Sequence, residues 1–209
     1  MKPCIIFCAA GFDGLRCPIP DDALTIAADG GLRHTQTLGI APDVILGDFD
    51  SLGYIPADSR VFPVEKDDTD AMLAVRLGLQ RGCDFFLFYG AMDGPRLDHT
   101  VANFQTLQFL ADHGAEGYLV GLTQIATVVK NSSIVFPESA QGIVSVFCMG
   151  ADASGVTLEN LQYPLLDGTL SPGFPLGVSN HFIGKSARIC VQSGSLLILY
   201  DRENGFPIR

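Results

Sequence analysis

The chain has 209 residues, of which 47% are hydrophobic and 17% charged, and its formal net charge at pH 7 is −10. This composition predicts a compact folded protein and not a disordered one, with room for one large domain or two small ones. The acidic balance and the lack of a basic patch argue against nucleic acid as a partner. An anionic substrate would therefore need metal ions and a few well-placed cations.

Six cysteines are scattered along the chain, and none stands in a Cys-x-x-Cys pair. Several lie in apolar runs such as 4–8, so we expect buried free thiols, a reducing compartment, and neither zinc nor disulfides. The apolar start of the chain is broken early by Gly11, which argues against a signal peptide. No apolar run has the length of a membrane span, so we expect no membrane association and a cytoplasmic location.

The first half of the chain alternates short apolar runs with helical patterns. Apolar runs at 4–10 and 24–28 predict buried strands, and a short helix is expected at 32–38 with Gly39 as its stop. A strand, a glycine-rich turn, a helix and another strand form a βαβ signature. The later strands expected here are 44–46, 61–64, 84–89 and 117–122. We also expect a helix from the acidic cluster at 65–70 to about Arg81, and a helix capped by Asp98 that runs to about His113.

From about residue 124 short β-rich runs recur, separated by Asn, Ser, Gly and Pro, and no long helical period appears. The segment 168–177 is rich in Gly and Pro, and we expect it to be a loop between strands. We therefore predict an α/β domain with a Rossmann-like parallel sheet over 1–123, and an all-β sandwich domain over 124–209. The expected strands of the second domain are 125–129, 133–136, 143–148, 155–161, 186–191 and 196–200.

The most distinctive stretch is Gly-Asp-Phe-Asp-Ser at 47–51, which follows a fully apolar run. In an extended chain Asp48 and Asp50 would point to one side and Phe49 to the other. Ligands of open α/β sheets bind beyond the carboxyl ends of the strands, and two facing carboxylates are costly unless a cation lies between them. We interpret the pair as a Mg²⁺ site, with a solvated acidic turn as the alternative.

Three other stretches with charged or glycine residues also follow predicted strands, at 29–31, 66–70 and 96–99. Together they would bring carboxylates, cations and two helix N-termini to one edge of the sheet. Phosphoryl and pyrophosphoryl transfer use such groups, because catalysis there is mostly positioning and charge neutralisation. The chain has neither a Gly-x-x-x-x-Gly-Lys-Ser/Thr loop nor a Gly-x-Gly-x-x-Gly motif, so a P-loop kinase and a dinucleotide dehydrogenase do not fit.

These motifs, in this order and spacing, resemble the thiamine pyrophosphokinase family. The segments that carry the resemblance are Ala28–Gly31, Pro42–Ser51, Lys66–Asp70, Arg96–His99 with Asn103, and Gly177–Asn180. The resemblance implies an α/β domain followed by a β-sandwich, and a homodimer whose two active sites are shared between subunits. It implies an enzyme that moves the terminal diphosphate of its co-substrate ATP to the hydroxyethyl oxygen of thiamine, giving thiamine diphosphate and AMP.

Carried over residue by residue, the resemblance implies roles for three groups of side chains. The Mg²⁺ ligands would be Asp48, Asp50 and Asp70, which with Asp98 form the catalytic set. Ser179 and Asn180 would face the thiamine pyrimidine from the partner subunit. The nucleotide and polyphosphate site would be lined by Asp29, Gly30, Gly31, Lys66, Thr69, Arg96, Asp98 and His99.

The chain departs from the family pattern in three places. Pro95 stands where a second glycine usually precedes the Arg, which stiffens that loop. Leu32-Arg33 replaces the small residue and Asn that often follow Asp-Gly-Gly. The chain has no Trp, so any aromatic contact with thiamine must come from Phe or Tyr.

Two other functions compete with this interpretation. A haloacid-dehalogenase-like phosphatase also has an apolar strand followed by Asp-x-Asp, which would make Asp48 and Asp50 a nucleophile and a general acid. That motif normally lies on the first strand, and Gly47 interrupts the approach here. The other alternative is a non-catalytic module that binds thiamine or a nucleotide, although simple binding rarely needs three acids around a metal.

Overall fold

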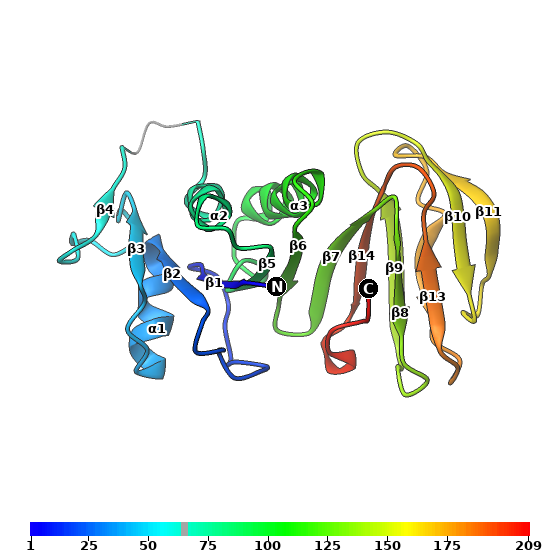
Figure 1. Cartoon of the computed structure of the whole chain (residues 1–209), viewed down its shortest axis with the longest axis horizontal. Coiled ribbons are helices and arrows are strands. Elements are labelled where there is room, and N and C mark those ends of the chain that lie inside the picture. Colours follow the sequence, from blue (N-terminus) through cyan, green and yellow to red (C-terminus); the bar gives the residue numbers. More distant parts are fainter. Residues whose placement is uncertain (64–66) are drawn as a thin grey trace. The chain divides into compact units, whose positions relative to one another are not determined.

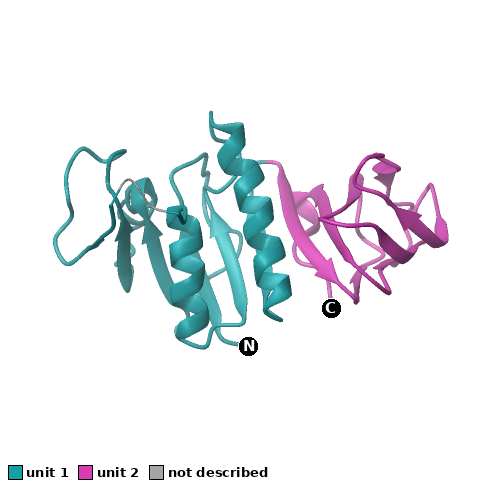
Figure 2. Ribbon diagram, turned by 90° about the horizontal axis from the view of Figure 1, so that it is seen from above, with its two compact units in different colours: residues 1–122 teal, residues 123–209 magenta. Residues whose placement is uncertain are grey.

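The computed structural model of the protein describes residues 1–63 and 67–209. The end of the strand predicted at 61–64 and the predicted nucleotide ligand Lys66 therefore lie outside the described residues. The chain divides into two compact units, Met1–Leu122 and Thr123–Arg209 (Figure 2).

Unit 1 contains a parallel sheet in which the strand order is β6-β5-β1-β2-β3-β4 (Figure 1). The chain runs outward from β1 through β2, β3 and β4 on one side, and returns through β5 and β6 on the other. Such a reversal of strand order leaves a crevice at the carboxyl ends of the strands, where ligands of α/β proteins bind. The strands are β1 (Pro3–Phe7), β2 (Leu24–Ala28), β3 (Val44–Gly47), β4 (Arg60–Val61), β5 (Phe85–Tyr89) and β6 (Glu116–Val120).

The helices of unit 1 cover both faces of this sheet: α1 (Leu32–Leu38) lies on one face, and α2 (Asp70–Gln80) and α3 (Leu97–Asp112) lie on the other (Figure 1). Gly39 ends α1 in the left-handed conformation that the sequence predicts for a helix stop, with φ 69°. The prediction that Asp98 caps α3 is wrong. Arg96 occupies the cap position, and Asp98 lies in the first turn of the helix.

Within unit 2 the strands pair antiparallel and lie in two sheets, in the orders β12-β9-β14-β7 and β11-β10-β13-β8. Phe136 of one sheet and Tyr200 of the other lie in its core, with their ring centroids 4.9 Å apart. The β-rich character predicted for this part of the chain is confirmed. The strands are β7 (Gln124–Lys130), β8 (Ser133–Phe136), β9 (Ile143–Cys148), β10 (Ala153–Glu159), β11 (Leu165–Leu170), β12 (Gly177–His181), β13 (Ala187–Cys190) and β14 (Ser195–Asp201).

The sequence patterns did not reveal β11 and β12, and the loop predicted at 168–177 overlaps both. In β11 only Leu170 is fully buried, so an apolar alternation is missing. In β12 an irregularity interrupts the pairing with β9, and Ser179 has φ 59°. A strand with a bulge and few buried side chains leaves little periodicity in its sequence.

All six cysteines are free thiols. Cys4 and Cys83 are buried, whereas the other four are only half-buried, so the prediction of buried thiols is correct for two of them. Across residues 1–63 and 67–209, no helix is both long enough and apolar enough to cross a membrane.

Candidate active site

The carboxylates of Asp29, Asp48 and Asp50 lie together at the carboxyl ends of two neighbouring strands. Each residue offers one oxygen, and the three oxygens lie within 4.8 Å of one another. Asp29 directly follows β2 and Asp48 directly follows β3, which pairs with β2 in parallel. The structure thus brings together the Asp48/Asp50 pair and adds Asp29, which the sequence had assigned only to the nucleotide.

The backbone around these acids is left-handed at Asp29 (φ 48°), Gly47 (φ 147°) and Phe49 (φ 61°). For a bulky residue such as Phe49 this conformation is uncommon and costs on the order of 1–3 kcal/mol. The Phe49 side chain is only 2% exposed, and its burial offsets that cost. The expectation of an extended chain through 48–50 is therefore wrong. A tight turn anchored by Phe49 gathers the two carboxylates on one side.

Gly30 and Gly31 allow the turn that carries Asp29 to approach β1 closely. A Cβ on Gly31 would collide with the carbonyl of Phe7, and a Cβ on Gly30 would lie 2.8 Å from both Ala9 Cβ and Ser51 Oγ. Real Cβ atoms essentially never lie so close to other heavy atoms. The two glycines therefore set the position of Asp29 through packing, which is a sufficient reason for their presence.

A divalent cation fits this carboxylate cluster. Three carboxylates so close together repel one another unless a positive charge is shared among them. Oδ1 of Asp29 is buried, and among the described residues it has no hydrogen-bond partner. Carboxylate oxygens are the protein ligands that Mg²⁺ prefers. Asp29, Asp48 and Asp50 are therefore suited to hold Mg²⁺ or a similar hard cation.

Asp70 is the first residue of α2 and is not among the three gathered carboxylates. The pKa of the nearby Cys8 thiol is raised to about 12, first by burial and then by the carboxylates of Asp70 and Asp29. Both acids therefore act on the same small region next to β1. The role of Asp70 as a metal ligand stays a prediction.

Thr69 and Arg76, which lie on either side of Asp70 in the sequence, stabilise the start of α2. Thr69 accepts a hydrogen bond from a backbone amide one turn along the helix, at 3.2 Å. Arg76 donates to Asp68 from Nε at 2.8 Å and from Nη2 at 3.3 Å, and its guanidinium lies 5.2 Å from the ring centroid of Phe109. Thr69, which the sequence assigned to the nucleotide, therefore has a structural role as a helix cap.

Arg96 and Asp98 form an exposed ion pair at the start of α3. Arg96 donates from Nη2 to Oδ2 at 2.6 Å and from Nε to Oδ1 at 3.3 Å. These hydrogen bonds lower the pKa of Asp98 and raise the pKa of Arg96, and the carboxylate of Asp50 raises the Arg96 pKa further. Arg96 is thus within electrostatic reach of the carboxylate cluster. His99 follows in the same helical turn and is exposed.

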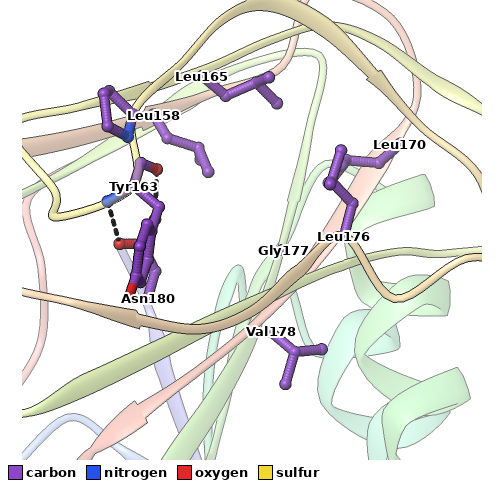
Figure 3. A pocket seen from close by; sticks show the side chains of 9 residues that line it. Leu158, Tyr163, Leu165, Leu170, Leu176, Gly177, Val178 and Asn180 are labelled. Atoms are coloured by element: carbon purple, nitrogen blue, oxygen red, sulfur yellow. Dashed lines mark hydrogen bonds between the residues drawn. The ribbon is translucent and has the colours of Figure 1, made fainter.

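Unit 2 has a cavity of about 140 Å³ whose wall is mostly apolar (Figure 3). Asn180 lies in this wall, but its side chain is only 3% exposed and is hydrogen-bonded to the backbone of Tyr163. Ser179 is exposed, and its amide donates to Ser145 Oγ at 3.0 Å. The residues that line the cavity are Leu158, Tyr163, Pro164, Leu165, Leu170, Leu176, Gly177, Val178 and Asn180.

Two features of these sites were missed by the sequence reasoning. The place of Asp29 in the carboxylate cluster could have been found, because Asp29 follows a predicted strand just as Asp48 does. Tyr163 could not, because an isolated tyrosine before a proline carries no motif of its own. Only the fold brings it into the wall of the cavity.

Two family models match this chain. "Thiamin pyrophosphokinase, catalytic domain" matches residues 19–119, and "Thiamin pyrophosphokinase, vitamin B1 binding domain" matches residues 131–198. Together they span well over half of the chain. The chain belongs to the thiamin pyrophosphokinase family.

Known members of the thiamin pyrophosphokinase family resemble this chain over most of its length. Thiamine pyrophosphokinase of Bacillus subtilis is 27% identical, over 86% of this chain and 87% of that protein. Its crystal structure has a TM-score of 0.80 at 23% identity, covering 96% of this chain and 99% of that one. The thiamin pyrophosphokinase of Geobacillus thermodenitrificans gives 0.78 at 26% identity, covering 96% and 97%. The predicted family and enzyme class are confirmed, and neither the phosphatase nor the binding module is favoured.

We expect Mg²⁺ or Mn²⁺ to raise the melting temperature of the wild-type protein, because a cation held by the folded carboxylates stabilises only the folded state. At a hundredfold excess over Kd the gain is about 2.7 kcal/mol. Asp50→Asn should raise the melting temperature in EDTA, since it removes like-charge repulsion, and should lose most of the response to metal. Thermal denaturation with and without metal measures both effects.

The exposed Asp22, which lies outside the cluster, offers a matched control. Asp22→Asn should keep the wild-type response to metal. An unchanged metal response in Asp50→Asn would contradict the assignment of the cluster.

Proposed function

We propose that this chain transfers the terminal diphosphate of ATP to the hydroxyethyl oxygen of thiamine. The observation that carries the proposal is the cluster of Asp29, Asp48 and Asp50, with Arg96 within electrostatic reach, in a member of the thiamin pyrophosphokinase family. The domain over 1–123, with its Rossmann-like strand order, would bind nucleotide and metal. The sandwich domain over 124–209 would bind thiamine, which the description of the model that matches 131–198 supports.

In this reaction the thiamine hydroxyl oxygen attacks the β-phosphorus of ATP, and the proton of the hydroxyl passes to solvent water. The bond from the β-phosphorus to the oxygen shared with the α-phosphate breaks, and AMP leaves with the electron pair. Asp98 is a weak proton acceptor, because the hydrogen bonds from Arg96 lower its pKa. We therefore assign Asp98 to holding Arg96 in place and not to proton transfer.

The residues of unit 1 would bind and orient the polyphosphate. Mg²⁺, when bound, would neutralise the charge of the phosphate oxygens around the reacting phosphorus. Asp29, Asp48 and Asp50 would hold that cation, with Asp70 as a further ligand. Arg96 would bind phosphate oxygens through its planar fork. Lys66, Thr69 and His99, together with the backbone at Gly30 and Gly31, would complete the nucleotide site.

We expect a mixture of ATP, thiamine, Mg²⁺ and this protein to form AMP and thiamine diphosphate in equal amounts, and EDTA to abolish the reaction. Asp48→Asn removes a charge at nearly constant shape, so turnover should fall by about two orders of magnitude or more while the melting temperature in EDTA is retained or rises. Chromatographic quantification of AMP measures the reaction. A folded, metal-supplied protein that forms no AMP would contradict the proposal, and phosphate release without thiamine would indicate the phosphatase.

We expect Arg96→Lys to raise the KM for ATP and to lower kcat, each by about tenfold or more, because an ammonium group cannot reproduce two directed hydrogen bonds to a phosphate. The KM for thiamine should stay near its wild-type value. Steady-state kinetics with each substrate varied in turn separates these effects. Arg188→Lys alters another exposed ion pair, with Glu159 in unit 2, and should change neither constant. An unchanged KM for ATP in Arg96→Lys would show that Arg96 is an exposed charge that does not bind ATP.

We further propose that the protein is a cytoplasmic homodimer in which each active site combines residues of two chains. Unit 2 exposes the large apolar side chains of Leu166, Phe174 and Leu176, at 84%, 65% and 53% exposure. Exposed apolar surface usually marks an interaction site. In a two-fold symmetric dimer, a single contact would bury this surface on both copies of the chain. Six free thiols support a reducing compartment.

Mixed dimers test this arrangement. Asp48→Asn disables the metal half of a site, and Asn180→Ala impairs the thiamine half. When the two variant proteins are dissociated, mixed and allowed to re-pair, half of the dimers are mixed, and one of the two sites in each mixed dimer carries no substitution. Activity at low thiamine should rise to about a quarter of the wild-type value. No rise despite proven exchange of chains would show that each site belongs to a single chain.

A further inference from the structure

The side-chain amide of Asn180 forms three hydrogen bonds with backbone groups, two of them with the distant Tyr163. Its Oδ1 accepts hydrogen bonds from the amides of Tyr163 and His181, both at 2.9 Å. Its Nδ2 donates to the Tyr163 carbonyl at 2.7 Å, and Figure 3 shows the contact between Asn180 and Tyr163. Tyr163 stands 17 residues earlier in the chain, between β10 and β11. One side chain in β12 therefore satisfies both backbone polar groups of Tyr163.

The residues before Tyr163 make two further backbone contacts, with the end of β12 and with the residue that follows it. Leu161 forms an isolated bridge with Phe182, and the amide of Gln162 donates to the carbonyl of His181 at 3.0 Å. Pro164 follows Tyr163 and has no amide hydrogen to donate. The two hydrogen bonds between Asn180 and Tyr163 thus fix the backbone where the chain enters the cavity wall.

The Tyr163 side chain is 60% exposed although its backbone is held on both sides. It lines the 140 Å³ cavity together with Leu165, Leu176 and Val178. Figure 3 shows Tyr163 and Asn180 close together on one side of this cavity, and Leu176 and Val178 on the other. Because its backbone is fixed, the ring can reach only the positions that its side-chain rotamers allow, which lowers the conformational entropy lost when a ligand binds.

We propose that Asn180 is a positioning residue that acts on the ligand site of unit 2 through Tyr163. This replaces the expectation that the Asn180 amide itself binds the thiamine pyrimidine. After its three hydrogen bonds, the amide has only one Nδ2 hydrogen left to offer a ligand. Asn180 is also only 3% exposed. The inference rests on the proposed function only in taking thiamine as the ligand of the cavity.

A double-mutant cycle separates positioning from direct binding. Asn180→Ala should weaken thiamine binding about tenfold or more, because it frees the Tyr163 backbone and leaves its polar groups unpaired. In the Tyr163→Ala background the same substitution should add almost nothing, since the residue through which Asn180 acts has gone. Calorimetric thiamine titration and the KM for thiamine measure both steps, and kcat should stay within about twofold. Fully additive losses would overturn the proposal and make Asn180 a direct ligand.

Asn204 offers a control with the same geometry. Its Oδ1 accepts from the amide of Gln141 and its Nδ2 donates to the carbonyl of Gln141, both at 2.9 Å. Neither residue is among those that line the cavity. Asn204→Ala should lower the melting temperature without changing thiamine affinity. An equal loss of thiamine affinity in Asn204→Ala would mean that any loosening of unit 2 has this effect, and the proposal would fail.

A second readout needs no thiamine at all. The chain has no Trp, so Tyr163→Trp places a single tryptophan on the cavity wall. Adding Asn180→Ala should shift its emission to longer wavelength and increase quenching by acrylamide, whereas adding Asn204→Ala should not. Unchanged emission would show that Asn180 does not hold the segment. A shifted emission in a protein that binds no thiamine would leave the positioning role intact and contradict only the proposed function.

Discussion

Mutual repulsion among Asp29, Asp48 and Asp50 is the constraint around which unit 1 is built. Carboxylates held within 4.8 Å of one another oppose folding until a cation is shared among them, so the surrounding structure must supply the stability. Two neighbouring parallel strands, β2 and β3, fix the points from which these acids emerge. The buried ring of Phe49 and the close packing of Gly31 against β1 then hold strained turns in place. Strain of this kind is typical of functional sites.

The two units contribute different physical properties to the proposed reaction. Unit 1 offers charge, with carboxylates for a cation and Arg96 within electrostatic reach of Asp50. Unit 2 offers an apolar cavity whose wall includes the exposed ring of Tyr163. Phosphate transfer requires the first property and recognition of an aromatic vitamin requires the second. In unit 1, Asp98 accepts hydrogen bonds from Arg96. In unit 2, Asn180 is hydrogen-bonded to the backbone of Tyr163. Arg96 and Tyr163 would contact the substrates, and their partners would hold them in position.

The sequence predicted well wherever a local pattern decides the structure. Apolar runs marked the strands of unit 1, and Gly39 ended its helix as expected, because only glycine adopts that conformation at little cost. It failed where tertiary contacts decide. The left-handed Phe49 is stabilised by burial, which no local pattern encodes, and the bulged strand β12 lacks a clear alternation. The contact of Asn180 with Tyr163 could not be predicted, because the motif that contains Asn180 says nothing about a partner 17 residues away.

In the proposed reaction Asp29, Asp48 and Asp50 jointly hold the cation on which diphosphate transfer depends. Crystals of the full chain grown with Mn²⁺ and a non-hydrolysable ATP analogue would locate that cation directly through anomalous scattering. We predict a strong peak in contact with oxygens from all three carboxylates, and its loss in Asp50→Asn crystals. A Mn²⁺ peak bound to the nucleotide but touching none of the three acids would show that these carboxylates do not hold the cation.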